Sequence, residues 1–182
     1  HLLQLINDVL DLAKIEAGKL EFRPEPVVVE SVIAEVTSLL RTLSLQKRIR
    51  IQIEADRSIE VVVLDPARFK QVLYNYLSNA LKFTPEGGHV VVRTCPDRPG
   101  SFRVEVEDSG IGIAPEQLQR LFLEFEQLET GAAVPQSTGL GLALTRRIVE
   151  AQGGTVGVRS NLGHGSVFHA VLPRETPAIV AR

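Results

Sequence analysis

Two amides, a lysine and an aromatic ring recur at helical spacing near the middle of the chain. Asn75 and Asn79 are four residues apart, and Lys82 and Phe83 follow about one turn later. At about 3.6 residues per turn, these side chains lie on or near one face of a helix. An amide oxygen suits Mg²⁺, and a lysine meets a phosphate as a point charge. The spacing indicates a magnesium–phosphate site with Asn79 and Asn75 as metal ligands, although a polar stripe on a surface helix explains it about equally well.

An acid followed by glycines ends one predicted strand. Asp108 closes the alternating pattern of residues 102–108, and Gly110 and Gly112 then force a turn. Such an acid can be a turn-former with no other role. A buried carboxylate, however, can accept a hydrogen bond from the amino group of adenine. Guanine presents a carbonyl there, which would leave Asp108 unpaired at a cost of about 1–3 kcal/mol, so the segment is a candidate for selecting ATP over GTP.

Two further glycine segments follow. Thr138-Gly139-Leu140-Gly141-Leu142 precedes a helical apolar pattern. The free N–H groups of a helix start, with glycines beside them, let phosphate oxygens approach the backbone. A plain glycine-assisted helix start is the alternative. Gly163-His164-Gly165-Ser166 is the weakest signal, because a hairpin turn without a ligand explains it equally well.

Composition argues against several other classes of protein. The 182 residues carry a net charge of −2, which does not favour nucleic-acid binding. The four histidines are scattered and Cys95 is the one cysteine, so neither a disulfide nor a zinc cluster is expected. P-loop, serine-hydrolase and dinucleotide motifs are absent. No apolar run could span a bilayer and no signal peptide is visible, which favours a cytoplasmic location; a membrane anchor of the parent protein could lie outside this segment.

The periodicity of the chain predicts the elements that position these segments. Asp65 is expected to cap a helix over 66–83, and residues 19–28 to form an edge strand or linker. Residues 127–138 are expected to form a loop, and the tail after Pro173 to be loose. The other helices are expected over 1–17, 29–46 and 139–152, with a short one near Pro115, and strands over 49–54, 60–64, 89–95, 102–108, 155–160 and 166–172. This irregular alternation with antiparallel hairpins favours an α+β fold with one mixed sheet.

Helix 1–17 carries an apolar stripe at spacings of three and four. An isolated helix of this length is marginal in water, so it needs partners. We expect it to belong to a helix bundle whose other helices lie upstream or on another chain.

Together, these segments closely resemble the ATP-binding catalytic domain of the sensor histidine kinases of two-component systems. The resemblance spans about residues 2–173. Residues 71–85 resemble the family's N box, 108–112 its first glycine box, 122–127 its F box and 139–142 its second glycine box. It implies that Asn79, with Asn75 nearby, holds Mg²⁺. It also implies that Lys82 contacts phosphate, Phe83 flanks the base and Asp108 binds adenine. The ATP-binding residues predicted in this way are Asn75, Asn79, Lys82, Phe83, Asp108, Gly110, Gly112, Ile113, Phe125, Thr138, Gly139, Leu140, Gly141 and Leu142.

The resemblance also implies an architecture and partners. The fold would be a two-layer α/β sandwich with a mixed sheet, the Bergerat ATP-binding fold, plus an N-terminal bundle helix. Residues 1–18 would be the second helix of the dimerisation domain, residues 19–174 the catalytic domain and residues 175–182 a flexible tail. An upstream dimerisation helix would make the intact protein a homodimer, and its partner would be the receiver domain of a response regulator.

The activity expected from the resemblance is that of a protein-histidine kinase. ATP, with Mg²⁺, would donate its γ-phosphate to a histidine on the dimerisation helix, for relay to the response regulator. His1 is not expected to be this acceptor, because the acidic residue and the proline of the acceptor motif do not follow it.

Two alternatives stay open. A hydrolytic ATPase of the same superfamily would carry a glutamate as general base one turn before the magnesium asparagine, where Asn75 stands, so this reading ranks lower. A degenerate, non-catalytic nucleotide-binding adaptor gains weight because residues 126–138 contain no arginine or lysine.

Overall fold

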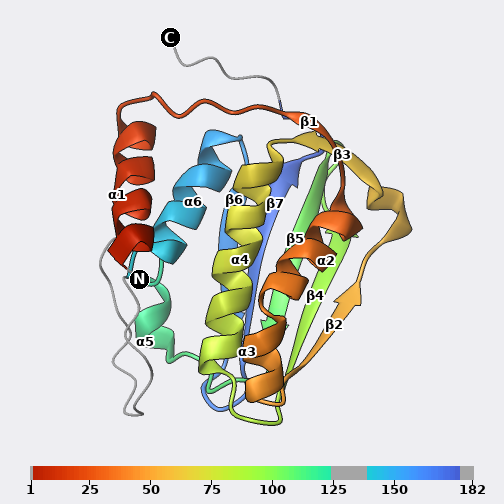
Figure 1. Ribbon diagram of the computed structural model, residues 1–182, viewed down its shortest axis with the longest axis vertical. Helices are drawn as coiled ribbons and strands as arrows, with labels where there is room; N and C mark the ends of the chain where they lie inside the picture. The colour runs from red at the N-terminus through yellow and green to blue at the C-terminus, as the bar shows by residue number, and fades with distance from the viewer. Residues whose placement is uncertain (1, 124–138, 177–182) are drawn as a thin grey trace.

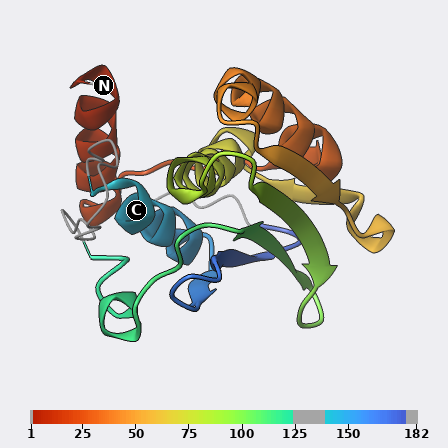
Figure 2. The same ribbon diagram turned by 90° about the horizontal axis from the view of Figure 1, so that it is seen from below.

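The computed structural model describes residues 2–123 and 139–176, which form a helical layer on one face of a mixed sheet (Figures 1 and 2). The α+β fold predicted from the sequence is confirmed. The helices are α1 (Leu2–Glu16), α2 (Val29–Leu39), α3 (Arg41–Gln46), α4 (Pro66–Phe83), α5 (Pro115–Leu118) and α6 (Gly141–Ala151), with a 3₁₀ turn at Arg57–Ile59. The strands are β1 (Glu25–Val28), β2 (Arg50–Glu54), β3 (Val61–Leu64), β4 (His89–Pro96), β5 (Ser101–Asp108), β6 (Thr155–Ser160) and β7 (Ser166–Pro173).

The main sheet has five strands in the order β2-β4-β5-β7-β6. β2 runs parallel to β4, and the other pairs are antiparallel, so the sheet is mixed. β5 lies at its centre, and Asp108 therefore ends the middle strand, opposite Val90 of β4 and Ser166 of β7. This central position keeps the acid away from open solvent.

Helix α4 fills the middle of the helical layer, between α6 and α2 (Figure 1). Asp65 caps it, since its carboxylate accepts the N–H of Arg68 at 3.0 Å, and Pro66 takes the first helical position. One side of the helix is apolar and fully buried on the sheet, and its residues are Phe69, Val72, Leu73, Tyr76, Leu77, Ala80 and Leu81. The opposite edges are left for polar side chains.

Three segments differ from the sequence-based prediction. The single helix expected over 29–46 is interrupted at Leu40, whose backbone leaves the helical region (φ −94°, ψ 3°) while its side chain is buried, and this divides it into α2 and α3. Residues 25–28, left open as edge strand or linker, form β1, which pairs with β3 in a separate two-stranded sheet. The chain beyond Pro173 is not loose at once, since Thr176 is buried and its N–H donates to the carbonyl of Val63 at 2.7 Å. Residues 175 and 176, which the sequence placed in a flexible tail, are therefore held against the fold.

Helix α1 lies beside α6 at the edge of the helical layer (Figure 1). Its buried Leu12 faces this layer, whereas Ile6, Val9 and Leu10 are 45%, 40% and 51% exposed. The sequence predicted partners upstream or on another chain. The structure shows that part of the apolar stripe is covered within this chain and that another part remains open.

Candidate functional site

Asn75 joins the middle of α4 to the start of α6. Its side-chain amide donates to the carbonyl of Gly141 and to the hydroxyl of buried Thr145, both at 3.0 Å. A substituent on Gly141 would sit 3.6 Å from this amide, so the two helices approach closely here. Because both amide hydrogens are engaged by protein, only the Asn75 oxygen remains to face a ligand.

Asn79 lies one turn further along α4 and is half-buried. Within residues 2–123 and 139–176, its amide has no hydrogen-bond partner. A half-buried amide with unmet hydrogen-bonding capacity is what a metal or phosphate ligand requires, and its oxygen suits Mg²⁺. Of the two predicted metal ligands, Asn79 fits this role directly.

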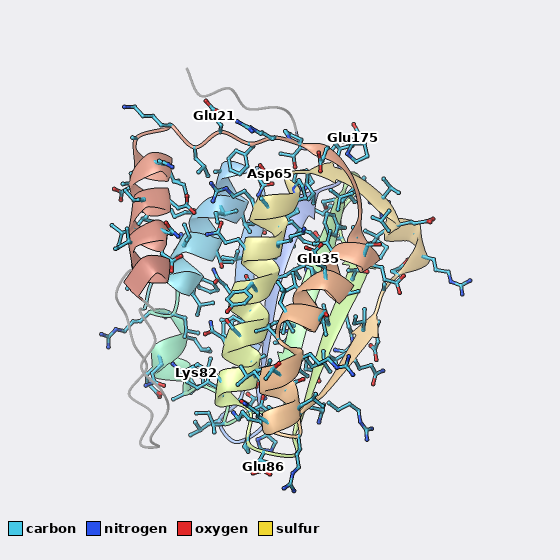
Figure 3. All side chains as sticks on the ribbon, viewed as in Figure 1. Glu21, Glu35, Asp65, Lys82, Glu86 and Glu175 are labelled. Atoms are coloured by element: carbon cyan, nitrogen blue, oxygen red, sulfur yellow. The ribbon has the colours of Figure 1, made fainter. Side chains whose placement is uncertain are left out.

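Lys82 and Phe83 form the last turn of α4. The Lys82 ammonium lies 5.1 Å from the centre of the Phe83 ring, and burial lowers the pKa of this lysine. Figure 3 shows Lys82 at the end of α4, on the side where α5 lies. Its ammonium donates to no oxygen of the described residues. A cation without a carboxylate partner among them therefore lies on the same helix face as Asn79.

Asp108 is 5% exposed at the end of β5. Burial raises the pKa of its carboxyl to about 6, against the opposing effect of backbone hydrogen bonds from Gly110 and Ser166. The Gly110 N–H donates to this carboxylate at 2.8 Å. The acid is therefore held rigidly and weakly solvated, as selective recognition of an amino group demands.

The first glycine segment fits tightly against the end of α4. A side chain on Gly110 would meet the Phe83 carbonyl at 2.8 Å, and the neighbouring Ile111 N–H donates to this same carbonyl at 3.3 Å. Gly112 has a φ of +67°, and a substituent there would clash with the Asn161 carbonyl at 2.0 Å. These contacts join the predicted adenine-binding acid to the predicted phosphate-binding turn.

The turn between β6 and β7 packs against this loop. The sequence did not distinguish such a packing role from that of a plain hairpin turn. A substituent on Gly165 would lie 1.9 Å from the Asp108 carbonyl, so only glycine fits there. The Ser160 hydroxyl accepts the Ile113 N–H at 2.9 Å and donates to the Gly165 carbonyl at 2.8 Å. Ser160 was missed, and its only sequence signal was its place at a strand end just before the glycine turn.

The second glycine segment starts α6. Gly139 has a φ of +71°, which favours glycine, and Leu140 is buried beside it. The helix that follows begins at Gly141, and no side chain of the described residues caps it; the N–H groups of such a helix start are of the kind that binds an anion. Leu142 packs against the core. Phe125 and Thr138 lie outside the described residues.

Contacts between the segments connect the predicted residues of α4, of the loop after β5 and of the start of α6. Two contacts close the arrangement, Asn75 to Gly141 and Phe83 to Ile111. A separate open groove of about 820 Å³ lies between α1, α2 and the first half of α4, and it touches this set only at Asn75. This groove reaches neither Asn79 nor Asp108, so it is distinct from the candidate site.

Comparison with known proteins points the same way. Residues 64–176 match the family described as histidine kinase-, DNA gyrase B- and HSP90-like ATPases. The circadian input-output histidine kinase CikA of Synechococcus elongatus is 39% identical over 97% of this chain and 24% of its own length. The crystal structure of full-length ShkA in complex with AMPPNP superposes with a TM-score of 0.86 at 35% identity, covering 98% of this chain and 37% of that one.

A third relative was solved with a partner. The histidine kinase ThkA in complex with the response regulator protein TrrA superposes with a TM-score of 0.70 at 27% identity, over 94% of this chain and 48% of that one. The chain spans about a quarter or less of the length of the first curated relatives that it matches. No helix within residues 2–123 and 139–176 is both long enough and apolar enough to cross a membrane.

Proposed function

This chain belongs to the family of histidine kinase-, DNA gyrase B- and HSP90-like ATPases, and we propose that it is the ATP-binding catalytic portion of a sensor histidine kinase. In the intact protein it donates the γ-phosphate of ATP to a histidine on a dimerisation helix outside these 182 residues. The phosphate then passes to a response regulator, as the complex of the similar kinase ThkA with TrrA suggests.

One observation carries the proposal. Asn79 and Lys82, whose polar side-chain groups have no oxygen or nitrogen partner among the described residues, share a helix face whose end is bonded to the loop that follows buried Asp108. A purine held by the acid can therefore direct its phosphates along α4 towards the amide, the lysine and the start of α6. Each of these groups is of the type that binds phosphate or its metal.

Mg²⁺ fits this arrangement. We propose that the Asn79 oxygen holds the ion together with phosphate oxygens, and that the Asn75 oxygen lies nearby. The bound ion would neutralise charge on the phosphates. The chain's own residues would orient the nucleotide: Asp108 at the base, Lys82 at the phosphates, and the glycine segments as backbone donors.

Transfer requires positioning more than covalent chemistry from this domain. A nitrogen of the acceptor imidazole forms a bond to the γ-phosphorus, the bond from that phosphorus to ADP breaks, and ADP leaves with the electron pair. Hydrolysis would instead need a base that activates water. The Asn75 amide, with both hydrogens bound to Gly141 and Thr145, cannot accept a proton at neutral pH, which supports transfer over hydrolysis.

Calorimetry with ATP, GTP and Mg²⁺ tests the proposal on this 182-residue chain. We expect ATP to bind more tightly than GTP, and Asp108→Asn to weaken ATP binding by about 10- to 100-fold, because a charge-assisted hydrogen bond is lost. Glu107→Gln is the matched control, since Glu107 precedes Asp108 on β5 but pairs with Arg93. Absence of binding at millimolar nucleotide would favour the adaptor. Multi-turnover ATP hydrolysis abolished by Asn79→Ala would favour the hydrolytic class.

The remaining proposals concern assembly and location. The exposed Ile6, Val9 and Leu10 of α1 supply an apolar face for the dimerisation bundle of a homodimer. A receiver domain of a response regulator is the proposed partner. Because ATP and such receivers act inside the cell, we propose a cytoplasmic location for this portion.

A further inference from the structure

The last turn of α4 ends in carbonyl groups that no helical N–H can reach. The Ala80 carbonyl accepts the Thr84 N–H at 3.0 Å, and the Phe83 carbonyl accepts the Ile111 N–H at 3.3 Å. The carbonyls of Leu81, Lys82 and Thr84 are all bound by one side chain from elsewhere in the chain.

That side chain is Lys47. Its ammonium lies 2.6 Å from the Leu81 carbonyl, 3.0 Å from that of Lys82 and 2.6 Å from that of Thr84. A lysine ammonium has three hydrogens, so this residue is fully engaged by one helix end. A cation at a helix C-terminus also complements the negative end of the helix dipole.

The fold delivers Lys47 to this point through the end of α3, which lies beside the end of α4 (Figure 1). Arg48 adopts a left-handed conformation with a φ of +51°, and its N–H donates to Leu45 at 3.1 Å. The Ile49 N–H donates to Ser44 at 2.8 Å, which completes a tight helix-ending turn. The Gly87 N–H also donates to the Lys47 carbonyl at 2.9 Å, so the lysine is held to the segment after α4 by backbone and side chain alike.

The Lys47 contacts affect the candidate site through two neighbouring residues, Lys82 and Phe83. Leu81, Lys82 and Thr84 flank Phe83, whose carbonyl is the one that receives Ile111 of the glycine loop. If the Lys47 ammonium is removed, the last turn of α4 is free to fray. The Lys82 side chain and the Phe83–Ile111 bond would then lose their fixed placement relative to Asp108.

We propose that Lys47 is a positioning residue for the nucleotide site: it binds no nucleotide itself, but locks the turn that carries Lys82 and Phe83. The inference rests on the proposed function for its nucleotide readout, and on geometry alone for its second readout. Nothing in the sequence marks it, because Lys47 is 34 residues from Leu81.

The first experiment compares affinity for Mg²⁺–ATP in the 182-residue chain at a temperature where circular dichroism shows every variant folded. Lys47→Met is expected to raise the Kd by about tenfold, about 1.4 kcal/mol. Lys47→Arg, which keeps a cation and several donors, is expected to recover part of this loss. Lys70→Met is the matched control, because Lys70 bonds Glu35 on α2 at 2.7 Å, at the other end of α4, and should leave affinity unchanged.

The second experiment follows amide hydrogen exchange by NMR without nucleotide. Lys47→Met is expected to speed exchange at Thr84 and Ile111, and to leave Phe69, in the first turn of α4, at the rate of the unmodified chain. This outcome supports the local lock even if no variant binds ATP, a result that would refute the proposed function instead. Uniform acceleration at all three amides, or a lower melting temperature with unchanged Kd, would overturn the inference and leave Lys47 with a purely structural role.

Discussion

The two halves of α4 differ in whether their polar side chains are hydrogen-bonded to other parts of the protein. In the N-terminal half they are bound by protein: Arg68 bonds Asp11 of α1 at 2.7 Å, and Gln71 bonds the same carboxylate at 3.2 Å. In the C-terminal half, Asn79 and the Lys82 ammonium have no hydrogen-bond partner among the described residues. Figure 3 shows Asp65 and Lys82 marking these two ends.

The contrast shows how one amphipathic helix serves two purposes. A polar group that is partly buried must be paired, by protein, water or a ligand. The paired half fastens α1 and α2 to the domain, whereas the unpaired half keeps hydrogen-bonding capacity that the proposed function assigns to the nucleotide. Composition alone does not separate the halves, because each carries an amide and a cation.

The largest effect expected from this contrast concerns ligand binding. Asn79→Ala should weaken Mg²⁺–ATP binding by about 100-fold while changing the free energy of unfolding by less than about 0.5 kcal/mol, because its amide has no hydrogen-bond partner among residues 2–123 and 139–176. Gln71→Ala, on the paired half, should instead lower the free energy of unfolding and leave Mg²⁺–ATP binding unchanged. Calorimetry and urea unfolding of both variants measure the two quantities. Equal losses of affinity in the two variants would refute the division.

The next effect is a pH dependence of opposite sign at two carboxylates. The folded-state pKa of Asp108, about 6, lies above its ordinary value of 3.8, so the native state binds more protons between these values. Its contribution to the free energy of unfolding is therefore greatest below about pH 4 and falls by about 2–3 kcal/mol as pH rises through 6. Burial also raises the pKa of Asp11, but hydrogen bonds from Arg68 and Gln71 and nearby positive charge lower it overall. Asp11 thus stabilises the fold above pH 3.8 and loses that contribution below it.

Urea titrations without nucleotide test this pair. The stability difference between the unmodified chain and Asp108→Asn should shift in favour of the variant between pH 4 and pH 7. The difference for Asp11→Asn should stay level over that range and change only in stronger acid. Parallel profiles for Asp108→Asn and the unmodified chain would show that the buried carboxyl titrates normally.

The smallest effect concerns the attachment of α1. Arg68→Ala should lower the free energy of unfolding by about 1–2 kcal/mol, because it leaves the Asp11 carboxylate without its main partner at a site where both side chains are mostly shielded, 20% and 18% exposed. Affinity for ATP should not change. A double-mutant cycle with Asp11→Ala isolates the pair, and a coupling energy near zero would mean that α1 is held by apolar contacts alone.

Much of the fold followed from local pattern. The helix predicted over 66–83 has those bounds because Asp65 caps one end and Pro85 stops the other, signals that lie within a few residues of the element. The bend at Leu40 was not predicted, since the apolar spacing continues through it and only packing requires the turn. The backbone bonds that hold residues 174–176 were likewise not predicted, because their partner Val63 is about 110 positions away in the chain.

The sequence named the candidate site residues, which stay a prediction, but it did not predict the bonds between them. No pattern in the sequence pairs Asn75 with Thr145, Lys47 with Leu81 or Gly165 with Asp108. The two members of each pair lie far apart in the chain, so no periodic pattern in the sequence connects them. The prediction that Asn75 holds the metal stays a prediction, now restricted to its oxygen.

Which side chains share a face of each helix or strand can be read from the amino-acid order, because those faces follow from the repeat of the local backbone. Which polar groups on these faces meet a protein partner depends on contacts between segments far apart in the chain, so it became visible only in the folded molecule. An amide and a cation occur in both halves of α4, and only their neighbours make one set part of the fold's own contacts and leave the other set open among the described residues.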